Sequence, residues 1–224
     1  MLSDQALPSA MSLDDLQRLV KTGEGTYLEF KRTISSPKKI VKEIAAFANT
    51  NGGTLLVGVD DNQTLIGLLG YHEEEFLLHK AAQDLCRPRI SINIEIVHYG
   101  DRDILVVYVP EAEEKPVYVR NGSKKRDVYV RNDDKSVIAT DEAVSIMQNE
   151  TSEAGVTFEY GPNEQKLFHY LNEYEKITVK DYSNLIDVTS YQASQILVNL
   201  VSAGILEMNN QNSKEYYSFS VDCT

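Results

Sequence analysis

Tryptophan is absent from this 224-residue chain, and only two cysteines occur, Cys86 and Cys223. Two cysteines so far apart form neither a metal-binding motif nor a disulfide framework. The four histidines show no metal-ligand spacing, and the sequence contains no Gly-Lys-Ser/Thr phosphate loop. These absences exclude a zinc module and an ATP-driven motor built on the common patterns.

Long apolar runs are also absent. No stretch approaches the roughly 20 apolar residues that a membrane-spanning helix needs. The first eleven residues, MLSDQALPSAM, lack the basic and apolar pattern of a secretory signal peptide. We therefore expect a cytoplasmic protein without a membrane partner.

Positive charge is scarce, because 22 Lys and Arg stand against 34 Asp and Glu, a formal net charge of -12. Residues 1–150 hold 18 Lys and Arg against 24 Asp and Glu, and residues 151–224 hold 4 against 10. The second part is therefore the more acidic per residue. This balance argues against a surface coated with phosphate-binding groups, but it allows a local basic patch.

The stretch from Gly23 to Gly67 organises the chain. Its hydrophobic periods predict strand, helix, strand, turn and strand, at residues 26–31, 37–48, 55–59, 60–62 and 64–66. The helix has Ser35 or Ser36 as its cap and Pro37 at its first position. The run 55–59 is continuously apolar, which indicates a central strand covered on both faces.

The remaining pattern predicts two domains. In the first, a helix over 73–86 precedes a hairpin of residues 90–98 and 104–109, a second hairpin of 117–120 and 128–131, and a helix over 141–149. We place this domain at residues 1–150 and a linker at 151–161. Residues 162–224 then predict three helices and a terminal strand pair, the pattern of a small winged helix-turn-helix domain.

Three segments carry a resemblance to a known family. The chain has Glu24, Glu29, Phe30 and Lys31 in the spacing E-x-x-x-x-E-F-K, then AFANTNGG at the end of a helix, then TLLVGVDDNQTLIG. These segments resemble, in order, the Schlafen/AlbA-like DNA-binding domain over roughly residues 12–145. The resemblance implies an α+β fold with a mixed sheet and a role with nucleic acid, and many bacterial members carry a winged helix after it.

The same resemblance implies a candidate catalytic triad. In relatives that cut RNA, the acidic residues correspond here to Glu24, Glu29 and Asp60, which could hold a divalent cation, with Lys31 steadying a phosphate. The alternative from the residues alone is that Glu24 lies in a loop, Glu29 pairs with a lysine, and Asp60 starts a turn.

Cationic side chains form the candidate nucleic-acid-binding set. These residues are Lys31, Arg32, Lys38, Lys39, Lys42, Arg120, Lys124, Lys125, Arg126 and Arg131. Together they could form one groove, although each lysine run is also typical of a solvated helix face or hairpin tip. The family's small residues after the last of these positions are replaced here by Asn132, Asp133 and Asp134, which would repel a phosphate.

We therefore expect a transcriptional regulator that binds DNA rather than RNA, without catalysis or a cofactor. A divalent-metal-dependent ribonuclease and a protein–protein assembly module without nucleic acid are the alternatives. Residues 190–203, the helix that would read DNA in a winged helix, contain no Lys or Arg. We accordingly expect the C-terminal domain to mediate homodimerisation or another protein contact rather than DNA reading.

Overall fold

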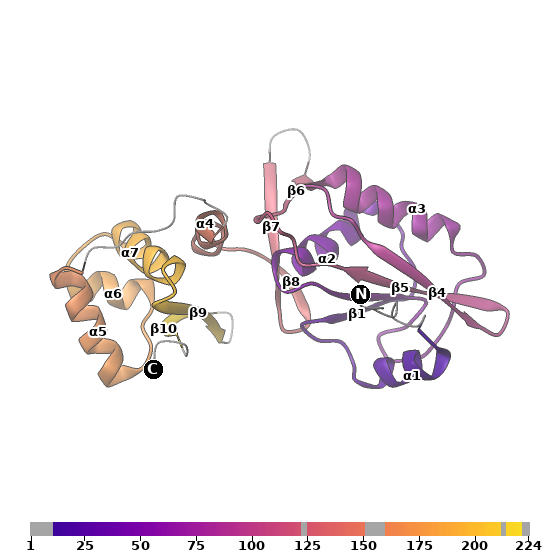
Figure 1. Cartoon of the computed structure of the whole chain (residues 1–224), viewed down its shortest axis with the longest axis horizontal. Coiled ribbons are helices and arrows are strands. Elements are labelled where there is room, and N and C mark those ends of the chain that lie inside the picture. The colour runs from indigo at the N-terminus through magenta and orange to yellow at the C-terminus, as the bar shows by residue number, and fades with distance from the viewer. Residues whose placement is uncertain (1–10, 122–124, 151–159, 212–213, 221–224) are drawn as a thin grey trace, which may run out of the picture. The chain divides into compact units, whose positions relative to one another are not determined.

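The computed structural model describes residues 11–121, 125–150, 160–211 and 214–220. The chain divides into two compact units, Met1–Ile138 and Ala139–Thr224. The elements of both units are labelled in Figure 1. None of the helices in these ranges has the length and apolar character required to cross a bilayer.

A mixed sheet forms the centre of the first unit. Its strands are β1 (Leu28–Lys31), β2 (Gly53–Val57), β5 (Arg102–Val109) and β4 (Asn93–Tyr99), in that spatial order. The pair β1 and β2 is parallel, and the other neighbours are antiparallel. The expected central strand and the expected hairpin of β4 and β5 are therefore present. The strand expected over 64–66 is reduced to a single bridge between Val59 and Leu65.

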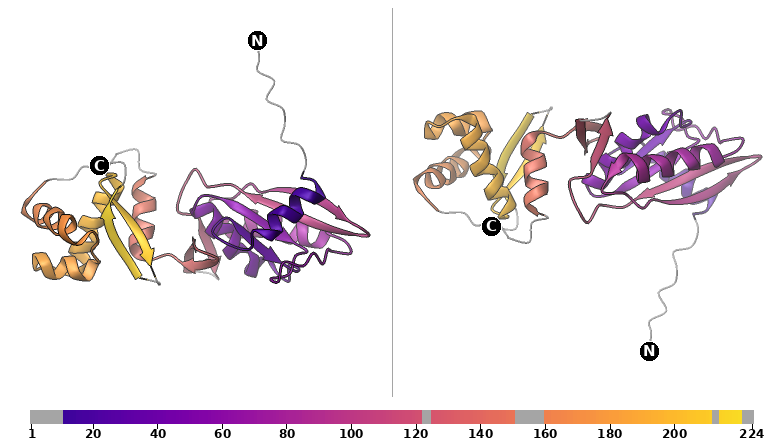
Figure 2. Two further views of the ribbon diagram at one scale, coloured as in Figure 1. Left: turned by 90° about the horizontal axis from the view of Figure 1, so that it is seen from below. Right: turned by 90° about the horizontal axis from the view of Figure 1, so that it is seen from above.

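Helices cover both faces of this sheet (Figure 2). α1 (Leu13–Lys21) packs Leu16 and Val20 against one face, where Leu28 and Phe30 also lie. α2 (Pro37–Asn49) packs against the opposite face, together with α3 (His72–Lys80) and the π-helical turn η1 (Ala81–Leu85). Because β1 is an edge strand, its α2-facing side chains lie at the border of the sheet.

The two ends of α2 follow from local sequence. Pro37 occupies the first turn, where a missing N–H costs nothing. After the helix, Gly52 adopts a φ of +71°, and a Cβ at this position would lie 2.8 Å from the carbonyl oxygen of Val109. Glycine is therefore required for the chain to turn from α2 into β2.

A second sheet packs on the other side of α2. Its strands are β3 (Cys86–Arg87), β6 (Tyr118–Asn121), β7 (Lys125–Asn132) and β8 (Lys135–Ile138), in that order. Buried Val119 and Tyr129 join the α2 core from this sheet. The buried Asn49 side chain fixes the contact, because its amide donates to the carbonyls of Val117 and Tyr129 and accepts from the Val117 N–H.

The second unit has its own apolar core. Its elements are α4 (Asp141–Glu150), α5 (Pro162–Tyr174), α6 (Val179–Ile186), α7 (Ser190–Ser202), β9 (Leu206–Gln211) and β10 (Lys214–Phe219). The three helices and the strand pair expected after residue 162 are all present. Leu167, Tyr182, Leu197 and Tyr217 are among the core side chains shared by these elements.

The division between the units lies earlier than the sequence indicated. We expected the first domain to continue to residue 150, but α4 groups with the second unit. The reason is packing: Ala143 and Ile146 are buried, and α4 contacts α7. The expected linker over 151–161 lies outside the described residues except for its last two positions.

Candidate nucleic-acid interface

Exposed cations gather around the start of α2. Lys38, Lys39 and Lys42 are all exposed on this helix, and Arg32 is exposed in the segment that precedes it. Lys31 and Lys39 line one pocket of about 180 Å³, together with hydroxyl groups of the segment 33–36 and the carboxylate-bearing Glu43. Five of the ten predicted cations therefore lie on one part of the first unit.

The first turn of α2 has the opposite charge to the usual one. Its first turn has no acidic residue and contains Lys38 and Lys39, and its last turn has no basic residue. The N-terminal end of a helix carries partial positive charge, so cations placed there repel it and anions are favoured. The Ser36 side chain also makes no capping hydrogen bond. This end of α2 is consequently a strongly electropositive surface.

Lys31 is only partly neutralised. Its ammonium donates to the Glu29 carboxylate and to the carbonyl of Phe30, the latter at 2.9 Å. An ammonium has three donors, so one remains for a ligand. Lys31 is about one-third exposed, which leaves that donor accessible from the pocket.

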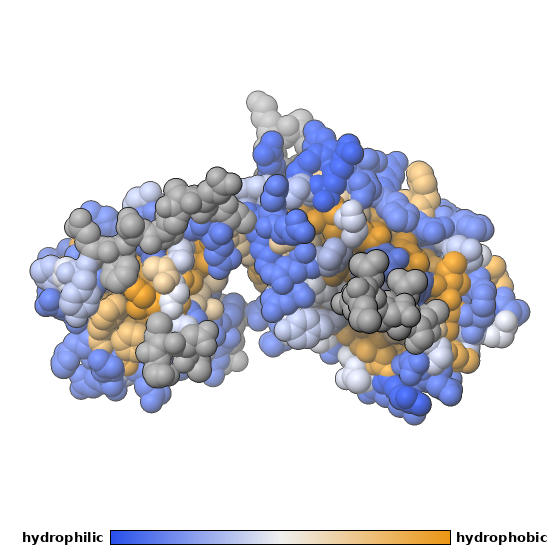
Figure 3. All heavy atoms as spheres, in the orientation of Figure 1, coloured by the Kyte–Doolittle hydropathy of each residue, from blue (hydrophilic) through white to orange (hydrophobic). Residues whose placement is uncertain are grey.

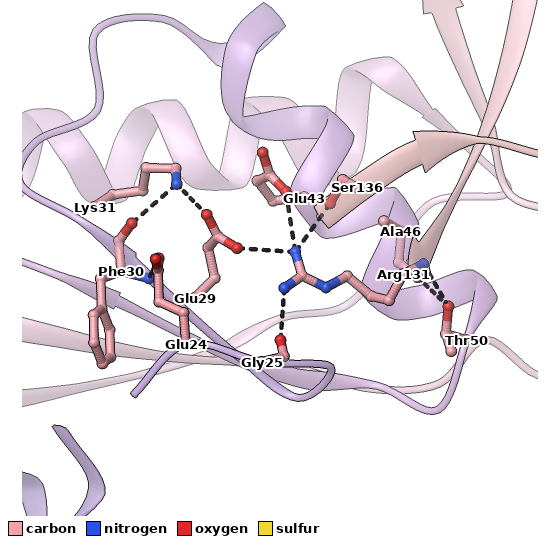
Figure 4. A network of polar contacts seen from close by, with 10 residues as sticks. All are labelled: Glu24, Gly25, Glu29, Phe30, Lys31, Glu43, Ala46, Thr50, Arg131 and Ser136. Carbon is pink, nitrogen blue, oxygen red and sulfur yellow. Dashed lines mark hydrogen bonds and ion pairs between the residues drawn. The ribbon is translucent and has the colours of Figure 1, made fainter. Parts of the chain in front are cut away.

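Arg131 does not belong to a surface. Its side chain is fully buried and lies at the centre of a polar network, seen in Figure 4. Its guanidinium donates to Glu29 at 2.9 Å, to Glu43 at 3.4 Å, to Ser136 at 3.1 Å and to the Gly25 carbonyl at 2.6 Å. The expectation that Arg131 contacts phosphate is therefore wrong in this structure, because all of these partners come from the protein.

The network joins segments that are distant in sequence. Glu29 comes from β1, Glu43 from α2, and Arg131 and Ser136 from β7 and β8 (Figure 4). The guanidinium also lies 4.7 Å from the centre of the Phe47 ring. A buried carboxylate is tolerated only when it is paired and hydrogen-bonded. Glu29, which is 7% exposed, meets this condition through Lys31 and Arg131.

The three acids of the candidate triad have separate roles. Glu24 accepts a hydrogen bond from the Phe30 N–H at 2.7 Å, and burial raises the pKa of its carboxyl, a shift that this hydrogen bond opposes. Both oxygens of Glu29 are engaged by cations. Asp60 lies in a turn, accepting from the Asp61 N–H, with Arg32 4.0 Å away.

These acids do not fit a metal site. Among the described residues, no group of three or more His, Cys, Asp or Glu side chains is arranged to hold a metal ion. The positions of Glu29 and Asp60 correspond to the alternative reading, a lysine pair and a turn aspartate.

The remaining predicted cations lie on the β6–β7 hairpin. Arg120 and Arg126 are exposed and are directly opposite one another across these strands. Lys124 and the side chain of Lys125 lie outside the described part of the chain. Asp133 and Asp134 are exposed in the turn after β7, where Asp133 has a φ of +54°. Because the Arg131 side chain is internal, the groove that these cations could form does not include it.

Sequence reasoning missed the residues that hold this region together. Glu43 and Ser136 were not singled out, although each contacts Arg131. Asn49 was read as part of a helix terminus, yet it is buried and bonded to residues 68 and 80 positions away. No local pattern marks such residues, because their partners are brought near only by the pairing of distant strands.

Comparison with known proteins places the first unit in a family. Residues 24–140 match the family described as Schlafen, AlbA_2. The chain is similar to the N-terminal domain of a protein of Nitrosomonas europaea named for its relation to the ATP-dependent DNA helicase RecG. That match has 24% identity and a TM-score of 0.40, and covers 51% of this chain and 84% of the other.

It is also similar to the DIP2311 protein of Corynebacterium diphtheriae, with 17% identity and a TM-score of 0.45. That match covers 87% of this chain and 35% of the other. The family match spans more than half of the chain and includes the segments that hold Glu24, Glu29, the α2 lysines and Arg131. The chain therefore belongs to the Schlafen, AlbA_2 family.

Proposed function

We propose that this protein is a nucleic-acid-binding regulator whose first unit contacts the phosphate backbone of DNA. The observation that carries the proposal is the electropositive start of α2, with Lys38, Lys39 and Lys42 exposed on one helix. Membership of the Schlafen, AlbA_2 family is consistent with it. Arg32 and Lys31 extend the cationic surface toward β1.

Electrostatics explain why a phosphate suits this surface. The three lysines form no ion pair with a described residue, so no carboxylate neutralises them. Phosphate groups would neutralise both the ammonium groups and the partial charge of the helix end, which are otherwise mutually repulsive. The surface is local, so it can act even though the whole chain has a net charge of -12.

We further propose that the second unit is a winged helix that mediates dimerisation or another protein contact. Its α7 has the position of a reading helix but carries no cation, and the whole chain has only four Lys or Arg after residue 150. A helix without cations has little to hold it in a DNA groove. Light scattering of the purified chain tests this: a dimer is expected, and a strict monomer contradicts it.

A fluorescence anisotropy titration with labelled duplex DNA over a series of salt concentrations tests the main proposal. The triple variant Lys38→Gln/Lys39→Gln/Lys42→Gln should bind at least tenfold more weakly at low salt. Each lost phosphate contact should also reduce the slope of log affinity against log salt by about 0.9.

The matched control removes the same charge elsewhere on the first unit. Arg18, Lys21 and Lys80 are exposed on α1 and α3, and the triple Gln variant of these residues should bind DNA nearly as well as the unaltered chain. Equal losses in the two triple variants would show a general charge effect rather than a site. Absence of any DNA binding by the unaltered chain at low salt would refute the proposal and favour the protein-assembly alternative.

A further inference from the structure

The second sheet of the first unit has one face turned away from α2. Residues of neighbouring antiparallel strands that are paired point to the same face, and successive residues alternate. The face that packs on α2 contains buried Cys86, Val119, Tyr129 and Arg131. The opposite face, here called the outer face, consists of Arg87, Tyr118, Arg120, Arg126, Val128, Val130, Asn132, Lys135 and Val137.

Charge on the outer face has one sign. Arg120, Arg126 and Lys135 contribute three exposed cations, and none of the described residues on this face is acidic. The Arg87 guanidinium is partly exposed and donates to the carbonyls of Gln83 and Cys86. This is unusual in a chain with a net charge of -12. Asp127 lies on the α2-facing side and is buried. The nearest acids in sequence, Asp133 and Asp134, are confined to the turn that joins β7 to β8.

Two of these cations are placed at a cost to the folded unit. Arg120 and Arg126 are direct cross-strand partners, and like charges in this relation destabilise a sheet. Neither makes an ion pair with a described residue. Arg126 instead lies 5.9 Å from the centre of the Tyr118 ring, so Arg126 and Tyr118 project from the same face. A bound polyanion would remove the repulsion between the arginines.

The cations surround an apolar centre. Val128, Val130 and Val137 occupy the middle of the outer face, between the arginine pair and Lys135. Val130 and Val137 are partly exposed, whereas Val128 is buried, so the accessible apolar surface consists of the first two valines. A duplex presents phosphates outward and hides its bases, so it has nothing to place on this apolar surface. A single strand can contact the cations with its phosphates and the apolar side chains and aromatic rings with its bases.

We propose that the outer face of the second sheet binds single-stranded nucleic acid. This inference rests on the proposed function, but it assigns a second surface, on the side of the sheet opposite α2, and a different form of the ligand. Lys135, which sequence analysis did not select, belongs to this surface. Figure 3 shows that hydrophilic residues cover the part of the first unit where β7 and β8 lie.

The test uses the full chain and a labelled oligodeoxythymidine strand, compared with a labelled duplex. The double variant Arg120→Thr/Arg126→Thr keeps strand-forming residues at both positions. It should bind the single strand about tenfold more weakly, and its salt slope should fall by about 0.7 for each lost contact. Its affinity for duplex DNA should change less than twofold.

Two further variants distinguish a loss of charge at this surface from a general loss of charge and from a loss of the guanidinium groups. Arg18→Gln/Lys21→Gln removes two charges from α1 and should bind the single strand like the unaltered chain. Arg120→Lys/Arg126→Lys keeps both charges and should retain the salt slope. A circular dichroism melt of each variant establishes that loss of binding is not loss of folding.

Three results would overturn the inference. The threonine variant could bind the single strand as tightly as the unaltered chain, the α1 variant could lose as much affinity, or the loss could be confined to duplex DNA. If the unaltered chain binds DNA and only the α2 triple variant loses this binding, the inference about the outer face fails while the proposed function stands. If the unaltered chain binds no nucleic acid of either form, both fail.

Discussion

At the scale of single residues, Arg131 determines how the first unit is held together. Replacing it by methionine would leave Glu29 and Glu43 without their shared partner inside the protein. Removing one member of a buried ion pair costs about 3–5 kcal/mol, because the remaining charge stays desolvated. We expect Arg131→Met to lower the free energy of unfolding by this amount, measured by urea denaturation.

The control for this prediction is Arg126→Met on the same strand. Arg126 is exposed and should change the free energy of unfolding by no more than about 0.5 kcal/mol. Adding Glu29→Gln to Arg131→Met should recover part of the loss, since it removes one unpaired charge. A small effect of Arg131→Met, similar to that of Arg126→Met, would contradict the structural role.

Glu215 gives the second unit a dependence on pH. Burial raises the pKa of its carboxyl above the usual 4.5, the hydrogen bond from Thr140 opposes the shift, and the Glu142 carboxylate adds to it. The folded unit therefore holds this proton more tightly than the unfolded chain does. As pH rises above 4.5 and through the raised pKa, this group lowers the stability of the folded unit.

Glu215→Gln keeps an acceptor for Thr140 and removes the charge. We expect it to raise the melting temperature of the second unit at pH 7, and the gain should shrink as pH falls toward 4.5. The matched change Glu173→Gln, at an exposed position of α5, should not alter the pH profile. A gain that is equal at both pH values would show that the charge is not the cause.

At the scale of elements, the lysines at the start of α2 are expected to favour DNA binding and to lower the stability of the helix. Lys38→Glu places an anion in the first turn, where it interacts favourably with the helix dipole. We expect a stability gain of about 0.3–1 kcal/mol and, at the same time, weaker DNA binding. Lys42→Glu, beyond the first turn, should weaken binding without that gain. Urea denaturation measures the change in stability of both variants, and fluorescence anisotropy measures the change in their DNA affinity.

The elements themselves could be predicted better than their assembly. α2 was found from Pro37 and its apolar period. The helix predicted over 141–149 is also present, and the Thr140 hydroxyl at its start accepts from the Ala143 N–H. These signals are local. The pairing of β3 with β6, which places Arg87 beside Tyr118, and the ion pair of Glu29 with Arg131 join residues far apart. No periodicity within one segment encodes these long-range contacts. The sequence therefore did not distinguish the buried Arg131 from the exposed cations.

At the scale of the whole molecule, the two units differ in what they contribute. The first has the cationic surfaces, and the second is acidic, with α4 as part of its core. We predict that a fragment of residues 139–224 is more stable than one of residues 151–224. Burial of Ile146 alone should contribute about 1.5–3 kcal/mol.

Hydrogen bonds from α4 add to this difference. Thr140 bonds Glu215 and Ser194 bonds Glu142, so the shorter fragment loses both. Urea denaturation of the two fragments should show a lower midpoint for the shorter one. Equal midpoints would mean that α4 contributes nothing to the core of the second unit, and would contradict the boundary at residue 138.

The position of the guanidinium at the border of the main sheet has one more effect. No described strand pairs with the outer side of β1, and local contacts cover that edge instead: Leu28 bonds to Gly25 in both directions, the Phe30 N–H donates to Glu24, and the Phe30 carbonyl accepts from Lys31. Arg131 donates to the carbonyl of Gly25, the residue that covers Leu28 at this edge. A chain without this guanidinium should hold Gly25 less firmly and expose Leu28 more often, and an exposed strand edge is a template on which another copy can add a strand. We therefore expect the same arginine to protect solubility as well.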